Sequence, residues 1–237
     1  MTSDRVNEYM VLDKETLESC LRDLGNLLDK RIKKDGINCE LIIVGGASVI
    51  LNYGFRYSTS DIDCTDAQKV LMNDLINVVA EKYNLPHNWI NTSFTDTKSY
   101  SPKIYQYSSF YKSYGNGKLI IRTIKDEYLL AMKIASGRKY KNDYSDIFGI
   151  ITSYIKEKHV ITKDMLEKAI VDLYGSLDDI DEEIFIFTKK VIDNPSRFNY
   201  EDIRKSEDLN KELLKSKIKD NNQADIEYIL SKLEIDK

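Results

Sequence analysis

The spacing of hydrophobic and polar residues predicts mixed strands and helices in the first half of the 237-residue chain. Apolar residues recur every three or four positions from Asp13 to about Lys34, which predicts an amphipathic helix with Asp13 as its N-cap. The β-branched run Leu41–Val44 predicts a buried strand, and residues 47–52 a short helix. Alternation over Ser58–Thr65 predicts a second strand.

Further elements follow up to residue 124. Apolar spacing from Ala67 to Tyr83 predicts another amphipathic helix. Residues Ile104–Tyr111 and Lys118–Ile124 are expected to be strands, because the Asn-Gly pair within Tyr114–Gly117 supplies the positive φ angles of a hairpin turn. Trp89–Asn91 is expected to lead into a loop near the functional residues. Together these strands predict one mixed sheet with helices on it.

The rest of the chain is helical in pattern. One helix is expected over Tyr128–Gly137, with Asp126 as its N-cap, and another from Asn142 to about Glu157. Further helices are predicted at 163–174, 179–193, 200–217 and 222–234. A sheet followed by helices indicates an α+β fold. We divide it into an N-terminal helix packed on the core (1–37), the core itself (38–156) and a C-terminal helical domain (157–237).

Composition and charge narrow the class of protein. With 35 basic and 39 acidic residues the net charge is −4, so nothing at the level of the whole chain indicates a polyanion-binding surface. The three cysteines lack metal-site or redox spacing, which suits a reducing compartment and a cytoplasmic location. No stretch has the pattern of a signal peptide or a membrane span, and two histidines argue against a histidine-rich zinc site.

Two features near the first strands carry candidate chemistry. Gly45 and Gly46 follow a predicted strand directly, where bare backbone and the N–H groups of the next helix favour an anion, although a plain tight turn would look the same. Asp61 and Asp63 fall on one side of the next strand, because side chains alternate. Two such carboxylates repel each other unless a cation lies between them, and Mg²⁺ is the expected cation. The alternative is a pair of solvated acids at an exposed strand end.

Three stretches together resemble a known fold. They read Gly45-Gly46-x-Ser48, then Arg56-x-x-Thr59-Ser60-Asp61-Ile62-Asp63, and later Lys133-x-x-x-x-Arg138 followed by Lys141-x-Asp143-x-x-Asp146. This combination is similar to the nucleotidyltransferase fold shared with DNA polymerase beta, and most similar to the AbiEii-like type IV toxins and related bacterial nucleotidyltransferases. The resemblance spans about residues 38–155 and implies a nucleotidyltransferase-type mixed sheet flanked by helices.

The resemblance implies a role for each matching residue. The nucleotide would contact Gly45, Gly46, Ser48, Arg56, Ser60 and Arg138. The metal, Mg²⁺ or Mn²⁺, would be held by Asp61 and Asp63, and the catalytic residues would be Asp61, Asp63, Lys133 and Asp143, with Asp146 and Asp126 as additional candidates. The substrate would be an NTP. The acceptor is invisible in the sequence. Likeness to the toxins implies tRNA or another cellular macromolecule as acceptor and an antitoxin protein as partner, with no membrane, and an antibiotic or other small molecule is the alternative acceptor.

The residues themselves support part of this assignment. Lys133 lies inside an apolar helical stripe, where a lysine is costly unless it meets an anion; a lysine that snorkels to solvent is the alternative. Asp143 and Asp146 share the side of a helix that should face the core, but acids in a first turn also suit the helix dipole. The predicted strand Leu119–Ile124 holds no carboxylate, so a third acid would be Asp96, Asp126 or, as the resemblance implies, Asp143.

The expected activity is therefore metal-dependent transfer of an NMP from an NTP to an acceptor hydroxyl or phosphate. Two alternatives stay open. The missing carboxylate on the later strand fits a non-catalytic nucleotide-binding or interaction protein of the same fold, and a phosphotransferase would move the γ-phosphate from the same site.

Overall fold

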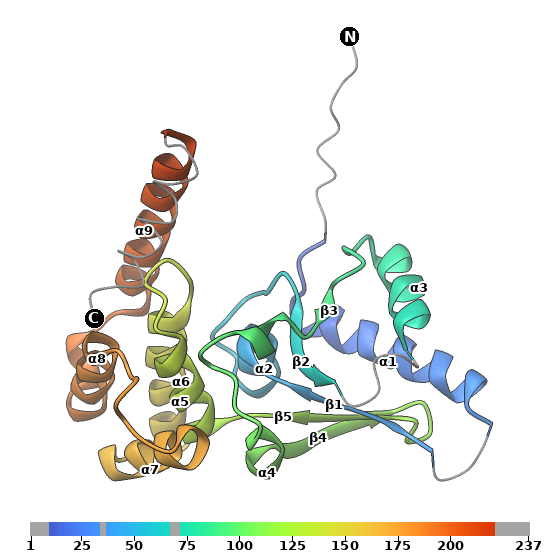
Figure 1. Cartoon of the computed structure of the whole chain (residues 1–237), viewed down its shortest axis with the longest axis horizontal. Coiled ribbons are helices and arrows are strands. Elements are labelled where there is room, and N and C mark those ends of the chain that lie inside the picture. The colour runs from blue at the N-terminus through green and yellow to red at the C-terminus, as the bar shows by residue number, and fades with distance from the viewer. Residues whose placement is uncertain (1–9, 34–36, 67–71, 221–237) are drawn as a thin grey trace. The chain divides into compact units, whose positions relative to one another are not determined.

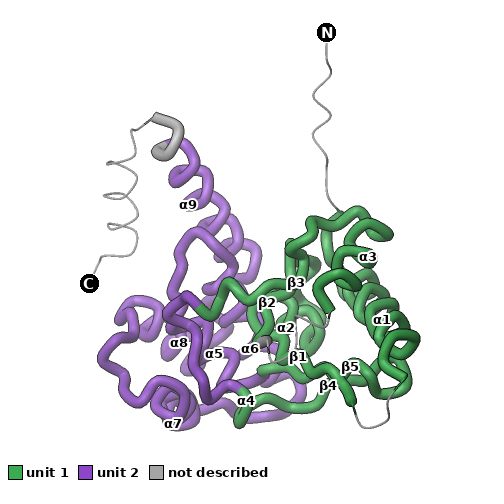
Figure 2. The backbone as a smooth tube through the Cα atoms, turned by 45° about the vertical axis from the view of Figure 1, so that its right-hand side comes forward, with its two compact units in different colours: residues 1–95, 105–124 green, residues 96–104, 125–237 purple. Residues whose placement is uncertain are grey.

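The computed structural model describes residues 10–33, 37–66 and 72–220 of the chain. The chain divides into two compact units, which Figure 2 colours separately. Unit 1 contains residues 1–95 and 105–124, and unit 2 contains residues 96–104 and 125–237. The domain boundaries predicted from the sequence follow a different division and stay a prediction.

Unit 1 is built on a five-stranded mixed sheet in the order β3-β2-β1-β5-β4 (Figure 1). The strands are β1 (Cys39–Ile43), β2 (Ile62–Asp66), β3 (Ile90–Asn91), β4 (Ser109–Tyr114) and β5 (Leu119–Thr123). The central strand β1 pairs antiparallel with β2 and parallel with β5. β3 adds parallel to β2, and β4 adds antiparallel to β5 as the predicted hairpin.

Helices bury their apolar faces against this sheet. They are α1 (Lys14–Arg31), α2 (Gly45–Asn52) and α3 (Asn73–Tyr83), whose buried residues join the core around the sheet. The 3-10 turn Ser93–Asp96 and the short α4 (Ile104–Tyr107) follow β3 in the chain. The Asp13 side chain accepts a hydrogen bond from the Thr16 amide, which confirms it as the N-cap of α1. The core gathers fully buried side chains of helix and strand, such as Leu21, Leu41 and Ile62. The periodic apolar positions in the sequence predict this burial, and the removal of their surface from water stabilises unit 1.

Unit 2 is helical apart from its irregular connections. Its helices are α5 (Asp126–Ser136), α6 (Asp143–Lys156), α7 (Lys163–Tyr174), α8 (Glu182–Asp193) and α9 (Tyr200–Asp220), with a 3-10 turn at Pro195–Arg197. α5 packs on α6 and α7, and α6 also packs on α8 and α9. Gly137 and Gly175 adopt left-handed φ angles of 58° and 89° and end α5 and α7.

The structure confirms the α+β class and most predicted elements, but it corrects several of them. β2 begins at Ile62 and not at Ser58, so Asp61 precedes the strand, and α1 ends at Arg31 and not near Lys34. Residues 104–107 form α4 rather than the start of a strand, because Ser101 and Ser108 side chains bond the backbone on either side of this turn. Ile90–Asn91 pairs with β2 instead of leading straight into a loop. Lys125 is the N-cap of α5, and Asp126 is its first residue.

Two predictions fall partly or wholly outside the described residues. The helix predicted over 67–83 begins at Asn73, with 67–71 outside the description, and the helix predicted over 222–234 lies outside it altogether. Across the part of the chain that is described, no helix is both long enough and apolar enough to cross a bilayer.

Candidate functional site

The first glycine of the turn after β1 lies against a carboxylate. Gly45 has a left-handed φ of +61° and begins α2, and Val44 before it donates its N–H to the carbonyl of Asp63 at 2.9 Å. A Cβ added to Gly45 would lie 3.1 Å from Asp63 Oδ2. Any other residue here would be strained and would press on this carboxylate. Glycine therefore lets Asp63 lie beside the start of α2.

The second glycine makes room for a cation. A Cβ on Gly46 would lie only 2.7 Å from Arg56 Nη2 and 2.8 Å from Thr59 Oγ1. The guanidinium is steadied by a hydrogen bond of 3.0 Å from Arg56 Nε to the carbonyl of Ser58. The N-cap Val44 offers α2 no side-chain hydrogen bond. A guanidinium and the positive end of a helix therefore lie together, an arrangement that favours an anion such as a phosphate group.

Asp61 lies directly before β2 and takes neutral donors. Its Oδ2 accepts from Asn91 Nδ2 at 3.1 Å, and its Oδ1 from Ser60 Oγ at 3.3 Å. Asn91 is buried and is itself fixed, because its Oδ1 accepts from the amide of Ser93 at 2.9 Å. Ile62, between the two aspartates, is fully buried, whereas Asp61 and Asp63 are half-buried, as the predicted alternation requires.

The donor chemistry of Asp61 and Asp63 suits an ion such as Mg²⁺ that takes most of its ligands from outside the protein. Among the residues that the structure describes, no three His, Cys, Asp or Glu side chains are grouped to hold a metal. Mg²⁺ is commonly bound by one or two carboxylates, with substrate phosphates and waters completing its shell. Asp61 and Asp63 supply two carboxylates of that kind, and the missing Cβ of Gly45 is what lets Asp63 Oδ2 lie against the start of α2.

Ser48 turns inward in the structure. It is fully buried, and its Oγ donates to the carbonyl of Ile124. Asn52 Nδ2 donates to the Ser48 carbonyl at 2.9 Å and to the Ile124 carbonyl at 3.2 Å, while Thr123 Oγ1 donates to Asn52 Oδ1 at 3.1 Å. Ser48 thus holds α2 to the end of β5. Its predicted phosphate contact, which would require this hydrogen bond to break, stays a prediction.

The predicted residues of unit 2 form a buried ion cluster of their own. Lys133 is 6% exposed, and Asp143 and Asp146 are fully buried. Lys133 Nζ lies 3.1 Å from Asp143 Oδ1 and 2.6 Å from Asp146 Oδ2. The expectation that this lysine meets an anion is therefore met by carboxylates of the same unit, and neither acid is merely placed for the helix dipole.

Asp143 is further held by Arg138. Arg138 donates to Asp143 Oδ2 from its side-chain Nε at 3.0 Å and from its backbone N–H at 3.1 Å. Burial alone would raise the pKa of Asp143, but the charges of Lys133 and Arg138 and these hydrogen bonds lower the pKa well below its usual range. A carboxylate stabilised in this way is a weak proton acceptor, which argues against Asp143 as the general base.

The other candidate acids lie elsewhere. Asp126 is the first residue of α5, with its Oδ2 3.8 Å from Lys125 Nζ, and Asp96 ends the 3-10 turn of residues 93–96. β5 carries no carboxylate. The sequence did not indicate that Thr59 lies against Gly46, or that Asn91 donates a hydrogen bond to Asp61. A polar residue directly after the buried pair Trp89–Ile90 was the available signal for Asn91.

The chain was compared with known protein families, curated proteins and solved structures. A family model described as "Nucleotidyltransferase of unknown function (DUF6036)" matches residues 19–206, which is well over half of the chain. The matched range includes both the turn of unit 1 and the ion cluster of unit 2. No curated protein and no solved structure matches the chain.

Proposed function

We propose that this chain, which belongs to the DUF6036 family of nucleotidyltransferases of unknown function, transfers an NMP from an NTP to an acceptor hydroxyl or phosphate. The observation that carries the proposal is the start of α2, where Gly45 admits the Asp63 carboxylate and Gly46 admits the Arg56 guanidinium. A guanidinium and a carboxylate therefore lie beside two successive residues at the start of α2, and we propose that they serve the phosphates and the metal. A nucleotidyl transfer site needs both, because a triphosphate binds together with a divalent cation.

The turn would bind the phosphates. The N–H groups at the start of α2 would bind a phosphate, and Arg56, whose guanidinium lies against Gly46, supplies a positive charge beside them. Charge that builds up on the transferred phosphoryl group would be neutralised by this guanidinium, whose position is already fixed by its bond to Ser58.

The paired acids would hold Mg²⁺ or Mn²⁺. Asp61 and Asp63 are the ligands that this chain offers, and the bound ion would supply charge neutralisation to the phosphate oxygens. Asn91 and Ser60 orient the Asp61 carboxylate through their hydrogen bonds. We therefore assign Ser60 a supporting role for Asp61 in addition to its predicted nucleotide contact.

The roles of the residues in unit 2 rest on resemblance alone. We retain Lys133 and Arg138 as predicted nucleotide contacts, and Asp143 with Asp146 as predicted acids of the reaction. A phosphate at Lys133 would have to displace a carboxylate, because both Asp143 and Asp146 lie within 3.1 Å of its Nζ. We accordingly propose that Asp143 acts through the placement of cations and not as a base.

The acceptor is proposed from the likeness to AbiEii-like toxins. On this basis the acceptor is tRNA, and a neighbouring antitoxin protein regulates the chain. Only the motif resemblance supports this part of the proposal, since a fold does not determine an acceptor. A small DNA-binding protein encoded beside this chain would strengthen it.

The test uses NTPs labelled at either the α- or the γ-phosphate, with Mg²⁺ and a pool of tRNA. Label from the α-phosphate should reach the RNA with release of pyrophosphate, and Asp61→Asn should lower the rate at least about 100-fold, as loss of a metal-placing group does. Asp74→Asn is the matched control, because Asp74 is an exposed acid of unit 1 paired with Arg31.

Each other outcome has a meaning. Equal rates for the wild type and Asp61→Asn would refute the proposed site. Transfer of the γ-label with release of NDP would identify a phosphotransferase. Tight NTP binding with no product would favour the non-catalytic nucleotide-binding protein, in keeping with the missing acid on β5.

A further inference from the structure

Helix α6 receives its N-terminal cap from a distant helix. Its N-cap residue, Asn142, makes no capping hydrogen bond with its side chain. Instead Glu207 on α9 accepts through Oε1 from the backbone N–H groups of Tyr144 at 2.9 Å and Ser145 at 3.0 Å. These are two of the donors that every helix start leaves without an intrahelical partner. Glu207 therefore does what an N-cap side chain normally does, from more than sixty residues away.

Glu207 is buried for this purpose. It is 3% exposed, and burial raises its pKa although hydrogen bonds from Ser145 oppose the rise. Its Oε2 accepts from Ser145 Oγ at 2.7 Å and from Arg204 Nη1 at 3.0 Å. The same arginine nitrogen also donates to Asn142 Oδ1. A carboxylate is costly to bury, so this many donors indicate a built arrangement and not a chance contact.

The cap bears directly on the ion cluster. Asp143 and Asp146 occupy the first turn of α6, where an acid is normally drawn toward the helix N-terminus. Glu207 already occupies the N–H groups of the second and third residues. Consequently the carboxylates of Asp143 and Asp146 are able to turn to Lys133, at 3.1 and 2.6 Å.

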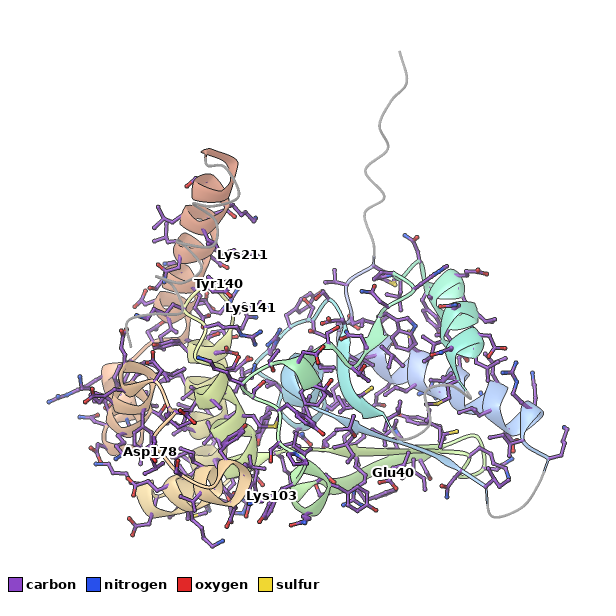
Figure 3. All side chains as sticks on the ribbon, in the orientation of Figure 1. Glu40, Lys103, Tyr140, Lys141, Asp178 and Lys211 are labelled. Carbon is purple, nitrogen blue, oxygen red and sulfur yellow. The ribbon has the colours of Figure 1, made fainter. Side chains whose placement is uncertain are left out.

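α9 also touches the connection that leads into α6. Asn210 Nδ2 donates to the carbonyl of Lys139 at 3.1 Å. Figure 3 shows Tyr140 and Lys141 of this connection near Lys211 of α9, in agreement with that bond. The same connection carries Arg138, the second cation of Asp143. α9 thus contacts both the start of α6 and the connection that leads into it.

We propose that Glu207 is a positioning residue for the ion cluster of Lys133, Asp143 and Asp146. By capping α6 it keeps the two carboxylates directed at Lys133 and keeps this lysine shielded. The consequence for catalysis rests on the proposed function, in which Lys133 and Asp143 take part. The consequence for the cluster itself does not, so the two can be tested separately.

The test of the cluster measures how fast Lys133 is acylated by an amine-specific reagent, read by mass spectrometry in the full chain. Lys215, which is exposed, provides the internal reference. Glu207→Ala should accelerate modification of Lys133 about 10-fold, since loss of a helix cap increases local opening by this order. Glu207→Gln keeps one carbonyl oxygen for the two N–H groups and should accelerate it less. Asp208→Ala is the matched control, because Asp208 bonds the same Arg204 but is exposed.

The result has to be local to support the proposal. Hydrogen exchange of peptides from α7 (Lys163–Tyr174) should stay unchanged in Glu207→Gln while Lys133 becomes more reactive. An unchanged rate at Lys133 in Glu207→Ala, which removes the cap altogether, would overturn the proposal. So would an equal increase in Asp208→Ala, or a rise in exchange throughout unit 2, since either would show a general loosening of the unit.

Activity supplies the second readout. Misplacement of Lys133 and Asp143 should lower kcat of Glu207→Ala about 10- to 100-fold, and Glu207→Gln, which keeps the capping oxygen, should lose less. KM for the NTP should rise by a smaller factor than kcat falls, because only the predicted contact of Lys133 is disturbed and the glycine turn, which would bind the phosphates, is untouched. A rise in KM with unchanged kcat would overturn the catalytic part. If the wild type transfers no nucleotide at all, the proposed function fails while the acylation result still decides the role of Glu207.

Discussion

Replacing Lys133 by methionine should strongly destabilise unit 2. Methionine keeps most of the length and apolar volume of the side chain but removes the ammonium group. In the wild type Lys133 Nζ lies 3.1 Å from Asp143 Oδ1 and 2.6 Å from Asp146 Oδ2. The side chains of Lys133, Asp143 and Asp146 are 7%, 1% and 0% exposed. The substitution therefore takes away a cation from two buried carboxylates, of which Asp143 retains Arg138.

The burial of the cluster determines how much free energy of unfolding the K133M variant loses. Removal of one partner from a buried ion pair costs about 3–5 kcal/mol in free energy of unfolding, because a buried charge is left uncompensated. Whole domains are stable by only about 5–15 kcal/mol, so this loss would bring unit 2 close to unfolding at room temperature. Lys215→Met is the control. Its pair with Glu212 has a similar distance of 2.8 Å but is exposed, and such pairs contribute about 0–1 kcal/mol.

The assay is urea unfolding followed by far-UV circular dichroism and by hydrogen exchange of peptides from α5 and α6. Fluorescence of Trp89, the one tryptophan of the chain, reports on unit 1 separately. The triple variant K133M/D143N/D146N should recover most of the lost stability, because no buried carboxylate of the cluster then remains. If the free energy of unfolding of K133M lies within about 1 kcal/mol of that of Lys215→Met, the reasoning from burial is refuted. Until this is measured, lost activity in a Lys133 variant does not by itself demonstrate a nucleotide contact.

Further predictions follow from single contacts. Gly45→Ala should cost about 1–2 kcal/mol through its φ of +61° and should weaken NTP binding in calorimetry, whereas Gly54→Ala, with nothing within 4 Å of the new Cβ, should do neither. Gly25→Ala should cost about 1–3 kcal/mol in thermal unfolding, because its Cβ would lie 2.5 Å from Tyr114 Cβ. The lowered pKa of Asp143 means that its stabilising contribution is complete above the ordinary value of 3.8 and is lost as the pH falls toward the native pKa. The stability difference between the wild type and Asp143→Asn should therefore shrink below pH 3.8, as acid titrations of both proteins would show.

Elements with a regular period were predictable from the sequence, and short elements were not. α1 and α7 show three- and four-residue apolar spacing and clear N-caps, so both ends of α7 and the start of α1 could be placed closely, although α1 ends at Arg31 and not near Lys34. β3 has two residues and α4 has four, which is too short for either period to be seen. In residues 104–107 the aromatic pattern favours a strand. Hydrogen bonds between the backbone and the side chains of Ser101 and Ser108 stabilise a helical turn there instead.

The candidate site was predictable where it depends on chain order. Gly45 follows β1 and Asp63 lies in β2, and these strands are neighbours, so the sequence could bring them together. The inward direction of Ser48 was not predictable, because it depends on the packing of α2 against the end of β5. Nor was the cap from Glu207, since a hydrogen bond across more than sixty residues leaves no local pattern.

The two sets of acids differ in how their charge is compensated, and this bears on which set would hold a metal. Asp143 and Asp146 are buried and already neutralised by Lys133, and Asp143 also by Arg138, so a cation would have to compete with fixed positive charges. Asp61 is half-buried and takes its described hydrogen bonds from neutral groups, Asn91 and Ser60, which orient a carboxylate without cancelling its charge. A divalent ion gains most where a carboxylate is oriented but still negative. This difference in charge compensation supports the proposal that Asp61 and Asp63 hold the metal, and the proposal that the acids of α6 position Lys133 and Arg138.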